Sequence, residues 1–449
     1  MIDNKENRKV SGQAPPEELS TFLELLIPDM NGIPRGKTIE ARSYDKDELP
    51  HLPASVFFQT LTGNYADVMP AYDEKDQDLL LNPDWSTCRR VPWRNDDHAQ
   101  VICESLDKSG LRSDFDPRNV LKRILARFAE EGLEPIIAPE VEFYLIKPVA
   151  DPSQPIEIAQ GVDHHTDFGG EALSIDALDK FSSFLDELRG MCTATDIQLA
   201  AIVHELGPAQ IELNVAHGDA LGRADQLFLL KRTVKACALR HHMTATFMAK
   251  PLADMPGSGL HLHSSLYKDG NNIFALNDGL APVALKQFIG GLQQHLPDAF
   301  SLISPSINSY KRFVPDLCAP INLQWGYDNR TTGFRVPYGA DENGRVENRI
   351  AGADANPYLF IAAHLACGLL GLLNGIDASE PVEKDAYDMP ADLPENLTQA
   401  LGRLEASEAL TKLLGKPFID AFVSVKRNEL HHASRDITPW ERKFLGSLV

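Results

Sequence analysis

The stretch APEVEFYLI, residues 138–146, alternates acidic and apolar residues in the pattern of a β-strand. Neighbouring side chains of an extended chain point to opposite faces, so Glu140, Glu142 and Tyr144 share one face and the other is apolar. The two carboxylates would lie roughly 6.5–7 Å apart and need water, cations or basic side chains between them. An isolated E-x-E is more often a solvated edge strand, so other segments must support a functional interpretation.

Three further segments repeat this alternation: AQIELNV (209–215), GLHLHSSLY (259–267) and GRVENRIAG (344–352). Each has an apolar face and a face of side chains that bind metals or anions. These side chains are Gln210, Glu212, Asn214, His261, His263, Arg345, Glu347 and Arg349. We expect a curved sheet around a wet, charged cavity that holds cations, and a structural ion-pair network is the alternative.

Helical periodicity occurs between these strands. Residues 112–132 predict a helix that Asp116 caps, that has Pro117 in its first turn and that ends at Gly132. Further helices are expected at 171–194, 222–242, 280–296, 356–375 and 396–414. The apolar run LFIAAHLACGLLGLL, 359–373, is too short to span a bilayer and contains His364, which predicts a buried helix.

The irregular alternation of helices and strands favours an α+β fold over a doubly wound sheet. Residues 1–17 are expected to be a flexible N-terminus, and residues 18–111, rich in short apolar runs and turn residues, a small strand-rich domain. Residues 112–449 then form a larger domain that carries the four polar strands.

Composition narrows the partners. The 43 Lys and Arg residues against 64 Asp and Glu give a net charge of −21, which argues against nucleic acid or an anionic membrane as the main partner. The polar start MIDNKENRKV lacks the apolar core of a signal peptide, and the six cysteines form no C-x-x-C pair. We expect reduced thiols and a cytoplasmic location.

The ligand types indicate the cation. A glutamate-rich set with one or two histidines and no cysteine favours Mg²⁺ or Mn²⁺ over zinc. Arginines on a neighbouring strand would meet anionic groups. Divalent cations combined with arginines are how proteins stabilise a phosphoryl group during transfer.

Six motifs in order resemble the glutamine synthetase family over about residues 20 to 390. They are PEVEF, HELGPAQIE, GSGLHLHSSL, NSYKRFVP, NRTTGFRVP and RVENRIAGADANPYL. The resemblance implies a β-grasp-like N-terminal domain and a larger catalytic domain with a curved antiparallel sheet flanked by helices. It also implies ATP-dependent phosphorylation of glutamate, displacement of phosphate by a nitrogen nucleophile, and a dodecamer of two hexameric rings.

The resemblance assigns roles by matched positions. Glu142, Glu205 and Glu212 match ligands of the metal nearer glutamate, and Glu140, His261 and Glu347 match ligands of the metal among the ATP phosphates. Gly257, Arg312 and Arg349 match glutamate contacts, and Arg330 matches the arginine that meets the transferring phosphate; Arg330 and Arg349 are the catalytic candidates. His263, Ser265, Arg335 and Arg345 match ATP contacts.

Two departures from the family pattern concern the nitrogen substrate. KRFVPDLCAP places Cys318 where glutamine synthetases carry an acidic residue, and LPASVFFQTLTGNYAD lacks their Asp-Gly-Ser-Ser loop. Both losses weaken an ammonium site and resemble the γ-glutamyl-polyamine and γ-glutamyl-monoamine synthetases of amine breakdown, which makes Cys318 an amine-site candidate. The resemblance therefore implies γ-glutamylation of an amine through γ-glutamyl phosphate. The alternatives are glutamine synthetase acting on ammonium and a non-catalytic scaffold.

Several assignments stay open at this stage. Neither the physiological amine nor the base that deprotonates it can be identified from the sequence. The candidates for the base are Asp316, Asp67 and Asp328. The aromatics that would wall an amine pocket, or else belong to the core, are Phe57, Phe58, Tyr65 and Trp325. Tyr387, in DAYDMP, lies where some glutamine synthetases are adenylylated, and the motif also occurs in unmodified relatives.

Overall fold

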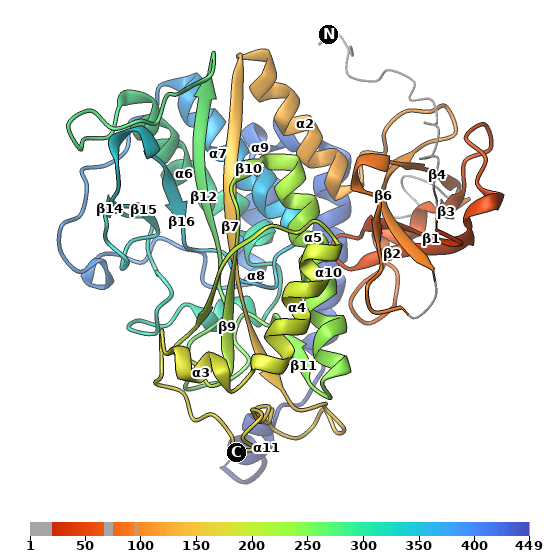
Figure 1. Cartoon of the computed structure of the whole chain (residues 1–449). Helices are drawn as coiled ribbons and strands as arrows, with labels where there is room; N and C mark the ends of the chain where they lie inside the picture. Colours follow the sequence, from red (N-terminus) through yellow and green to blue (C-terminus); the bar gives the residue numbers. More distant parts are fainter. Residues whose placement is uncertain (1–19, 67–74, 95–96, 449) are drawn as a thin grey trace.

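The computed structural model describes residues 20–66, 75–94 and 97–448, so the predicted flexible segment 1–17 lies outside the described residues. The described strands form two sheets, one of six strands and one of ten. In Figure 1 the smaller, N-terminal sheet lies at one side, and the long strands β7 and β12 run through the middle of the molecule. The predicted α+β class is confirmed, because helices and sheets alternate irregularly.

The smaller sheet has the order β2-β1-β6-β4-β3, with β5 beside β6. Strands β1 and β6 are parallel, and the other pairs are antiparallel. Leu23, Leu25 and Ile27 of β1 are fully buried. The strands are β1 (Phe22–Pro28), β2 (Pro34–Glu40), β3 (His51–Pro53), β4 (Asp78–Pro83), β5 (Arg89–Arg90) and β6 (His98–Leu106).

The larger sheet has the order β14-β15-β16-β12-β7-β9-β8, with β10 and β11 also paired to β7 and β13 to β12. Its pairs are antiparallel, as predicted, except that β14 runs parallel to β15. Its strands are β7 (Leu133–Ile146), β8 (Leu199–His204), β9 (Gln210–Val215), β10 (Gly218–Asp219), β11 (Thr244–Thr246), β12 (Leu260–Lys268), β13 (Asn271–Asn272), β14 (Trp325–Tyr327), β15 (Phe334–Val336) and β16 (Val346–Asn348).

Strand register brings the polar faces of the four predicted segments together. Across β7 and its neighbours, Glu140 is paired with His261 of β12, and Glu142 with Glu212 of β9. His263 is paired with Glu347 of β16, which is in turn paired with Arg335 of β15. Each charged residue therefore has a charged residue directly beside it on the same face.

The opposite face of these strands is apolar and buried. Val141, Phe143, Leu213, Leu260 and Leu262 have no exposed surface. Helices α2 and α5 contact β7, and α6 packs along α7. Among the described residues, α7 is the helix apolar and long enough to cross a membrane, but 78% of its apolar window is buried, which confirms the prediction of a core helix.

Each predicted helical region contains helix, but the ends of the helices differ and two of the regions are interrupted. Asp116 accepts from Arg118 N and caps α2, with Pro117 in the first turn, as predicted. The expected helix 171–194 is interrupted between α3 and α4, the helix 396–414 is interrupted at Ser407, and α6 continues through Pro297. The helices are α2 (Pro117–Glu130), α3 (Ile175–Asp179), α4 (Ser182–Ala194), α5 (Ala220–Arg240), α6 (Val283–Ile303), α7 (Pro357–Asn374), α8 (Leu397–Ala406), α9 (Glu408–Leu414), α10 (Lys416–Ala433) and α11 (Pro439–Leu448).

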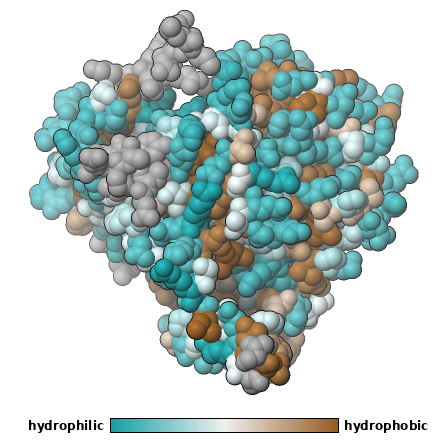
Figure 2. All heavy atoms as spheres, turned by 180° about the vertical axis from the view of Figure 1, so that it is seen from behind, coloured by the Kyte–Doolittle hydropathy of each residue, from teal (hydrophilic) through white to brown (hydrophobic). Residues whose placement is uncertain are grey.

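The last two helices were not predicted. Helix α10 buries Phe418, Ile419 and Phe422 on one side, a periodicity that the sequence does contain. The C-terminal segment that includes α11 leaves Ile437, Trp440 and Leu448 more than half exposed. Figure 2 shows hydrophobic surface at the lower end of the molecule, where the chain ends.

Candidate active site

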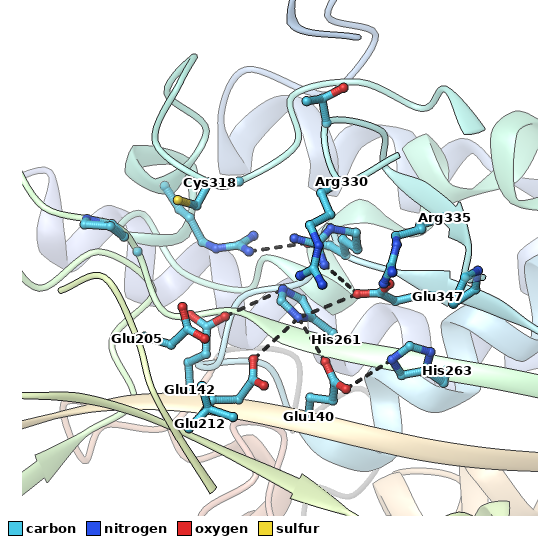
Figure 3. A pocket seen from close by; sticks show the side chains of 18 of the residues that line it. Glu140, Glu142, Glu205, Glu212, His261, His263, Cys318, Arg330, Arg335 and Glu347 are labelled. Atoms are coloured by element: carbon cyan, nitrogen blue, oxygen red, sulfur yellow. Dashed lines mark hydrogen bonds and ion pairs between the residues drawn. The ribbon is translucent and has the colours of Figure 1, made fainter. Parts of the chain in front are cut away.

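A cavity of about 720 Å³ lies over the polar face of the larger sheet (Figure 3). It is lined by every predicted site residue except Ser265: Glu140, Glu142, Glu205, Glu212, Gly257, His261, His263, Arg312, Cys318, Arg330, Arg335, Arg345, Glu347 and Arg349. Ser265 lines an adjoining hollow of about 500 Å³, which shares Glu140, His263 and Arg345 with the cavity. The geometry therefore brings the predicted set together around one hollow.

The imidazole of His261 lies among four carboxylates. Its Nδ1 is 3.4 Å from Glu140 Oε2, 3.9 Å from Glu347 Oε1 and 4.0 Å from Glu212 Oε2. Its Nε2 is 3.7 Å from Glu142 Oε1. Apart from the 3.4 Å contact with Glu140, these separations are longer than hydrogen bonds, and they leave space between ligand atoms that converge.

The cavity contains two groups of three possible ligand atoms, and within each group the atoms lie within 4.8 Å of one another. One consists of Glu140, Glu212 and His261, and the other of Glu140, His263 and Glu347. Glu140 belongs to both, and His263 Nε2 lies 3.1 Å from Glu140 Oε1. This grouping differs from the two sets expected from the family resemblance in two ways. It joins Glu212, expected at the other metal, with Glu140 and His261, and it places His263 among the ligand atoms.

On one side of this group of carboxylates, burial and neighbouring negative charges raise the pKa values. Burial, with the nearby Glu142 and Glu140, raises the pKa of Glu212 to about 9. Burial, with Glu142, raises the pKa of Glu205 to about 7. Crowded carboxylates at these positions lack positive charge, and a bound cation would supply it.

On the other side, histidines and arginines lower the pKa values of the carboxylates. Burial opposes ionisation of Glu140, but hydrogen bonds with His261 and His263 lower its pKa. Burial likewise opposes ionisation of Glu347, but Arg349 and the two histidines lower its pKa to about 2. Arg349 Nη1 donates to Glu347 Oε1 at 2.5 Å and Arg335 Nη1 donates to Oε2 at 2.8 Å, so arginines hold both oxygens of this predicted metal ligand.

The donor set fits hard divalent cations. Carboxylate oxygens predominate, with imidazoles beside them, and this chemistry suits Mg²⁺ or Mn²⁺. Glu142 is held in place by Gly259 N at 2.8 Å and by Gln210 Nε2 at 2.9 Å. A Cβ at Gly259 would lie 2.7 Å from His261 Nε2 and 3.2 Å from Glu142 Oε1, so this position keeps space beside two of the predicted ligands.

Arginines line the wall above the carboxylates. Arg312 is buried, donates from Nη1 to Ile350 O at 2.6 Å, and its Nε has no partner among the described residues. Gly257 packs so closely that a Cβ would lie 2.4 Å from Ala249 O and 2.6 Å from Arg312 Cγ. Arg330 is exposed and extends toward the carboxylates (Figure 3). The arginines therefore form a positively charged wall opposite a floor of carboxylates.

The two ends of the cavity differ. Cys318 lies at the Glu205 end, and Arg335 and His263 lie at the other (Figure 3). Leu173 and Val203 also line the cavity. Partial burial, with Glu142 and Glu205, raises the pKa of the Cys318 thiol, which keeps it neutral.

The remaining candidates fall in different places. Asp316 lines the cavity. Asp328 is paired with Arg335 Nε at 3.1 Å, and Asp67 lies outside the described residues. Tyr387 lines the cavity and donates from its hydroxyl to Ala319 O at 3.2 Å.

The four aromatics considered for an amine pocket do not line this cavity. Phe57, Phe58 and Trp325 are core residues, and Tyr65 is exposed. The sequence-based assignments also omitted Gln210 as the partner of Glu142, although its place on the polar face of AQIELNV gave the signal. Leu173 and Tyr338 were missed because they project from loops without a repeating pattern.

The fold and this cavity define a class of enzyme. The model of the glutamine synthetase catalytic domain matches residues 114–445, and the chain belongs to the glutamine synthetase family. It is a ligase that forms carbon–nitrogen bonds.

Particular relatives cover nearly the whole chain. It is 34% identical over 437 residues to gamma-glutamylputrescine synthetase PuuA of Escherichia coli (strain K12), covering 94% of this chain and 91% of the relative. It is 35% identical over 451 residues to the glutamine synthetase of Pyrococcus horikoshii, covering 94% of each. The ligand-free structure of GmaS superposes with a TM-score of 0.83 at 28% identity, covering 95% of this chain and 97% of that chain.

Proposed function

We propose that this ligase joins the γ-carboxyl group of glutamate to an amine at the expense of ATP and releases the γ-glutamyl amide, ADP and phosphate. The observation that carries the proposal is the makeup of the Glu205 end of the cavity. The neutral thiol of Cys318 lies there (Figure 3), and the apolar Val203, which is paired with Glu212, and Leu173, whose N donates to His204 O, line the same cavity. That end suits the carbon substituent of an amine better than a small ammonium ion. The relative named for γ-glutamylputrescine synthesis supports the same substrate class.

The chain's own groups divide the work in this proposal. Glu142, Glu205 and Glu212 would hold one divalent cation, and Glu140, His261 and Glu347 a second. Bound Mg²⁺ or Mn²⁺ offsets negative charge on phosphate oxygens. Gly257, Arg312 and Arg349 orient glutamate, and His263, Ser265, Arg335 and Arg345 orient ATP.

In the first step a γ-carboxylate oxygen of glutamate attacks the γ-phosphorus of ATP, and ADP leaves. Arg330 offsets the charge that develops on the phosphoryl oxygens. In the second step the amine nitrogen attacks the carbonyl carbon of γ-glutamyl phosphate, and phosphate leaves. The amine must lose a proton, because a protonated amine is not a nucleophile. Asp316 is the base candidate that lines the cavity.

Glutamine synthesis from ammonium is the second candidate, because the Pyrococcus horikoshii relative is a glutamine synthetase of similar identity. The test measures glutamate-dependent phosphate release with ammonium, putrescine, spermidine, spermine, ethanolamine, phenethylamine and isopropylamine. We expect at least one amine to exceed ammonium in kcat/KM. Ammonium exceeding every amine would overturn the proposal. Cys318→Asp should raise kcat/KM for ammonium relative to the amine by about 10-fold or more, which is the size of one charge-assisted contact. Cys318→Ser is the matched control.

We also propose that the enzyme works in amine breakdown as a homo-oligomer built from two hexameric rings. The exposed apolar side chains near the C-terminus support association between copies. Mass photometry of the full chain tests the oligomer, and a monodisperse monomer would contradict it. Growth on the preferred amine as nitrogen source, with and without the gene, tests the metabolic role.

A further inference from the structure

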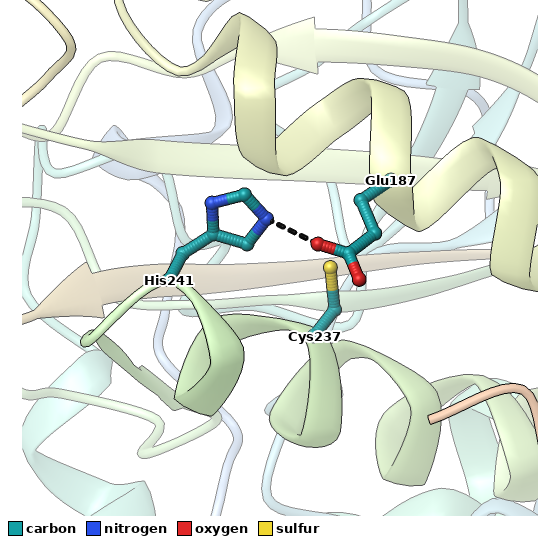
Figure 4. Close-up of side chains that lie close together, drawn as sticks. All are labelled: Glu187, Cys237 and His241. Carbon is teal, nitrogen blue, oxygen red and sulfur yellow. Dashed lines mark hydrogen bonds and ion pairs between the residues drawn. The ribbon is translucent and has the colours of Figure 1, made fainter. Parts of the chain in front are cut away.

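A second polar cluster lies outside the cavity, where helix α5 ends against helix α4 (Figure 4). Glu187 comes from α4, and Cys237 and His241 lie four residues apart at the end of α5. Residues four apart on a helix present their side chains on the same side. Figure 4 shows the carboxylate, the thiol and the imidazole directed toward one another.

The ligand atoms of these three side chains lie within 4.8 Å of one another. His241 Nε2 is 2.7 Å from Glu187 Oε2, and Arg240 Nε donates to the other oxygen, Oε1, at 2.6 Å. A cation placed between sulfur, nitrogen and Oε2 would therefore leave Oε1 held by Arg240 as an outer partner that orients the carboxylate.

The cluster combines burial with access. Cys237 has no exposed surface, whereas the side chains of Glu187 and His241 are 32% and 22% exposed. His241 also lines a neighbouring hollow of about 630 Å³, together with Phe184 and His242. A cation could enter from this side, and three protein ligands would leave a coordination position open toward the hollow.

The chemistry of this donor set differs from that of the cavity. Thiolate, imidazole and carboxylate are the ligands of zinc and similar borderline-soft cations, whereas Mg²⁺ and Mn²⁺ prefer oxygen. Two negative ligands would balance a divalent charge. An ion pair that only fastened α4 to α5 would need Glu187, Arg240 and His241. The Cys237 thiol, which donates to Phe184 O at 3.5 Å, brings a sulfur to the same space.

We propose that Glu187, Cys237 and His241 bind a divalent cation of the zinc class at a site separate from the active site. Binding replaces the contact between His241 and Glu187 and releases the thiol proton of Cys237. Burial, with Glu187 and Cys192, raises the pKa of the Cys237 thiol to about 12, so that proton is present before the cation binds. The bound cation would fasten α4 to the end of α5 and stabilise the folded chain.

The test titrates Co²⁺ into the full chain in excess Mg²⁺, which fills the oxygen-rich cavity. We expect a thiolate-to-cobalt absorption band that saturates at a single equivalent, is bleached by Zn²⁺, and accompanies a rise in melting temperature. Cys237→Ser should abolish the band, and Glu187→Gln and His241→Gln should weaken cobalt binding by more than about 10-fold.

Two controls separate this site from its neighbours. Cys318→Ser must keep the band, because Cys318 belongs to the cavity, and His242→Gln must keep it, because His242 lines the hollow without belonging to the cluster. Absence of the band in the unmodified chain, or its persistence in Cys237→Ser, would overturn the proposal. If Cys237→Ser does not fold, the partly exposed Glu187→Gln decides instead, and unchanged cobalt affinity in that variant would overturn the proposal.

Discussion

Strands β7 and β12 each have two faces with opposite properties, although successive residues of the same strand contribute to one face and then the other. On one face Glu140, Glu142 and His261 crowd around the cavity. On the other, Val141, Phe143 and Leu262 are fully buried against apolar neighbours. On the front face the carboxylates lie close enough to repel one another, and burial removes part of the water that would otherwise stabilise their charges. The back face supplies the packing that holds them in place.

This difference predicts that function and stability can be separated by moving one residue along a strand. Changes on the front should remove activity and leave folding nearly intact, because the carboxylates repel one another in the absence of cations. Changes on the back should lower stability and leave the chemistry of the remaining folded molecules unchanged.

The largest effect is expected for Glu142→Ala on the front face. If Glu142 holds a cation, its loss removes about 4 kcal/mol of charge stabilisation and lowers kcat/KM about 1,000-fold. Phosphate release with glutamate, ATP and the preferred amine measures it, and Glu130→Ala on the exposed end of α2 is the control. A collapse of the melting temperature in metal-free buffer would show instead that Glu142 is structural.

One residue further along the strand, Phe143→Ala changes the back face. Phe143 is fully buried and lies 5.4 Å, centroid to centroid, from Phe247. Removing the ring leaves a cavity and lowers the free energy of unfolding by about 3–5 kcal/mol. Urea denaturation measures it, with Phe168→Ala, at a side chain that is 85% exposed, as the control. Loss of kcat in the folded fraction would contradict the separation of the two faces.

Arg330→Lys addresses the wall above the carboxylates. A lysine keeps the charge but loses the planar fork, so we expect kcat to fall about 100-fold while KM for glutamate and ATP changes little. Initial rates over a matrix of both substrates separate the two parameters. Arg127→Lys, on the partly exposed side of α2, should change neither. A rise in KM for ATP at unchanged kcat would assign Arg330 to binding alone.

The contrast between the faces was accessible from the sequence, because alternation is a local property. The period of two in PEVEF and AQIELNV placed Glu140, Glu142, Gln210 and Glu212 on one face, and the structure has them there. Asp116 and Pro117 likewise fixed the start of α2, since a helix cap depends on adjacent residues.

Contacts between segments that are distant in the sequence could not be predicted from local patterns. The hold of Arg335 on Glu347 depends on the register of β15 against β16. The approach of His263 to Glu140 depends on β12 against β7. The Glu187, Cys237 and His241 cluster joins residues about fifty positions apart, and no local pattern marks it.

A buried histidine lies against the back face of the sheet. His364 of α7 lies 2.9 Å, through Nε2, from Ser264 Oγ, and Asn348 Nδ2 donates to its Nδ1 at 3.2 Å. Asn348 Oδ1 accepts from Ile350 N, which fixes the orientation of the amide. Nδ1 is therefore an acceptor, and Nε2 carries the hydrogen of a neutral ring. Burial lowers the pKa of His364 to about 3.

The smallest effect is a pH dependence of stability from this ring. An unfolded histidine takes up a proton near pH 6.5, whereas folded His364 stays neutral down to about pH 3. Stability is therefore lost as the pH falls through this window, by about 2 kcal/mol at pH 5. Urea denaturation between pH 5 and 7 should show this slope in the unmodified chain and in His432→Gln, an exposed control. His364→Gln should have a lower free energy of unfolding at pH 7, and that free energy should depend less on pH. If its dependence on pH is the same in all three proteins, His364 takes up its proton in the folded state as well, and the prediction is wrong.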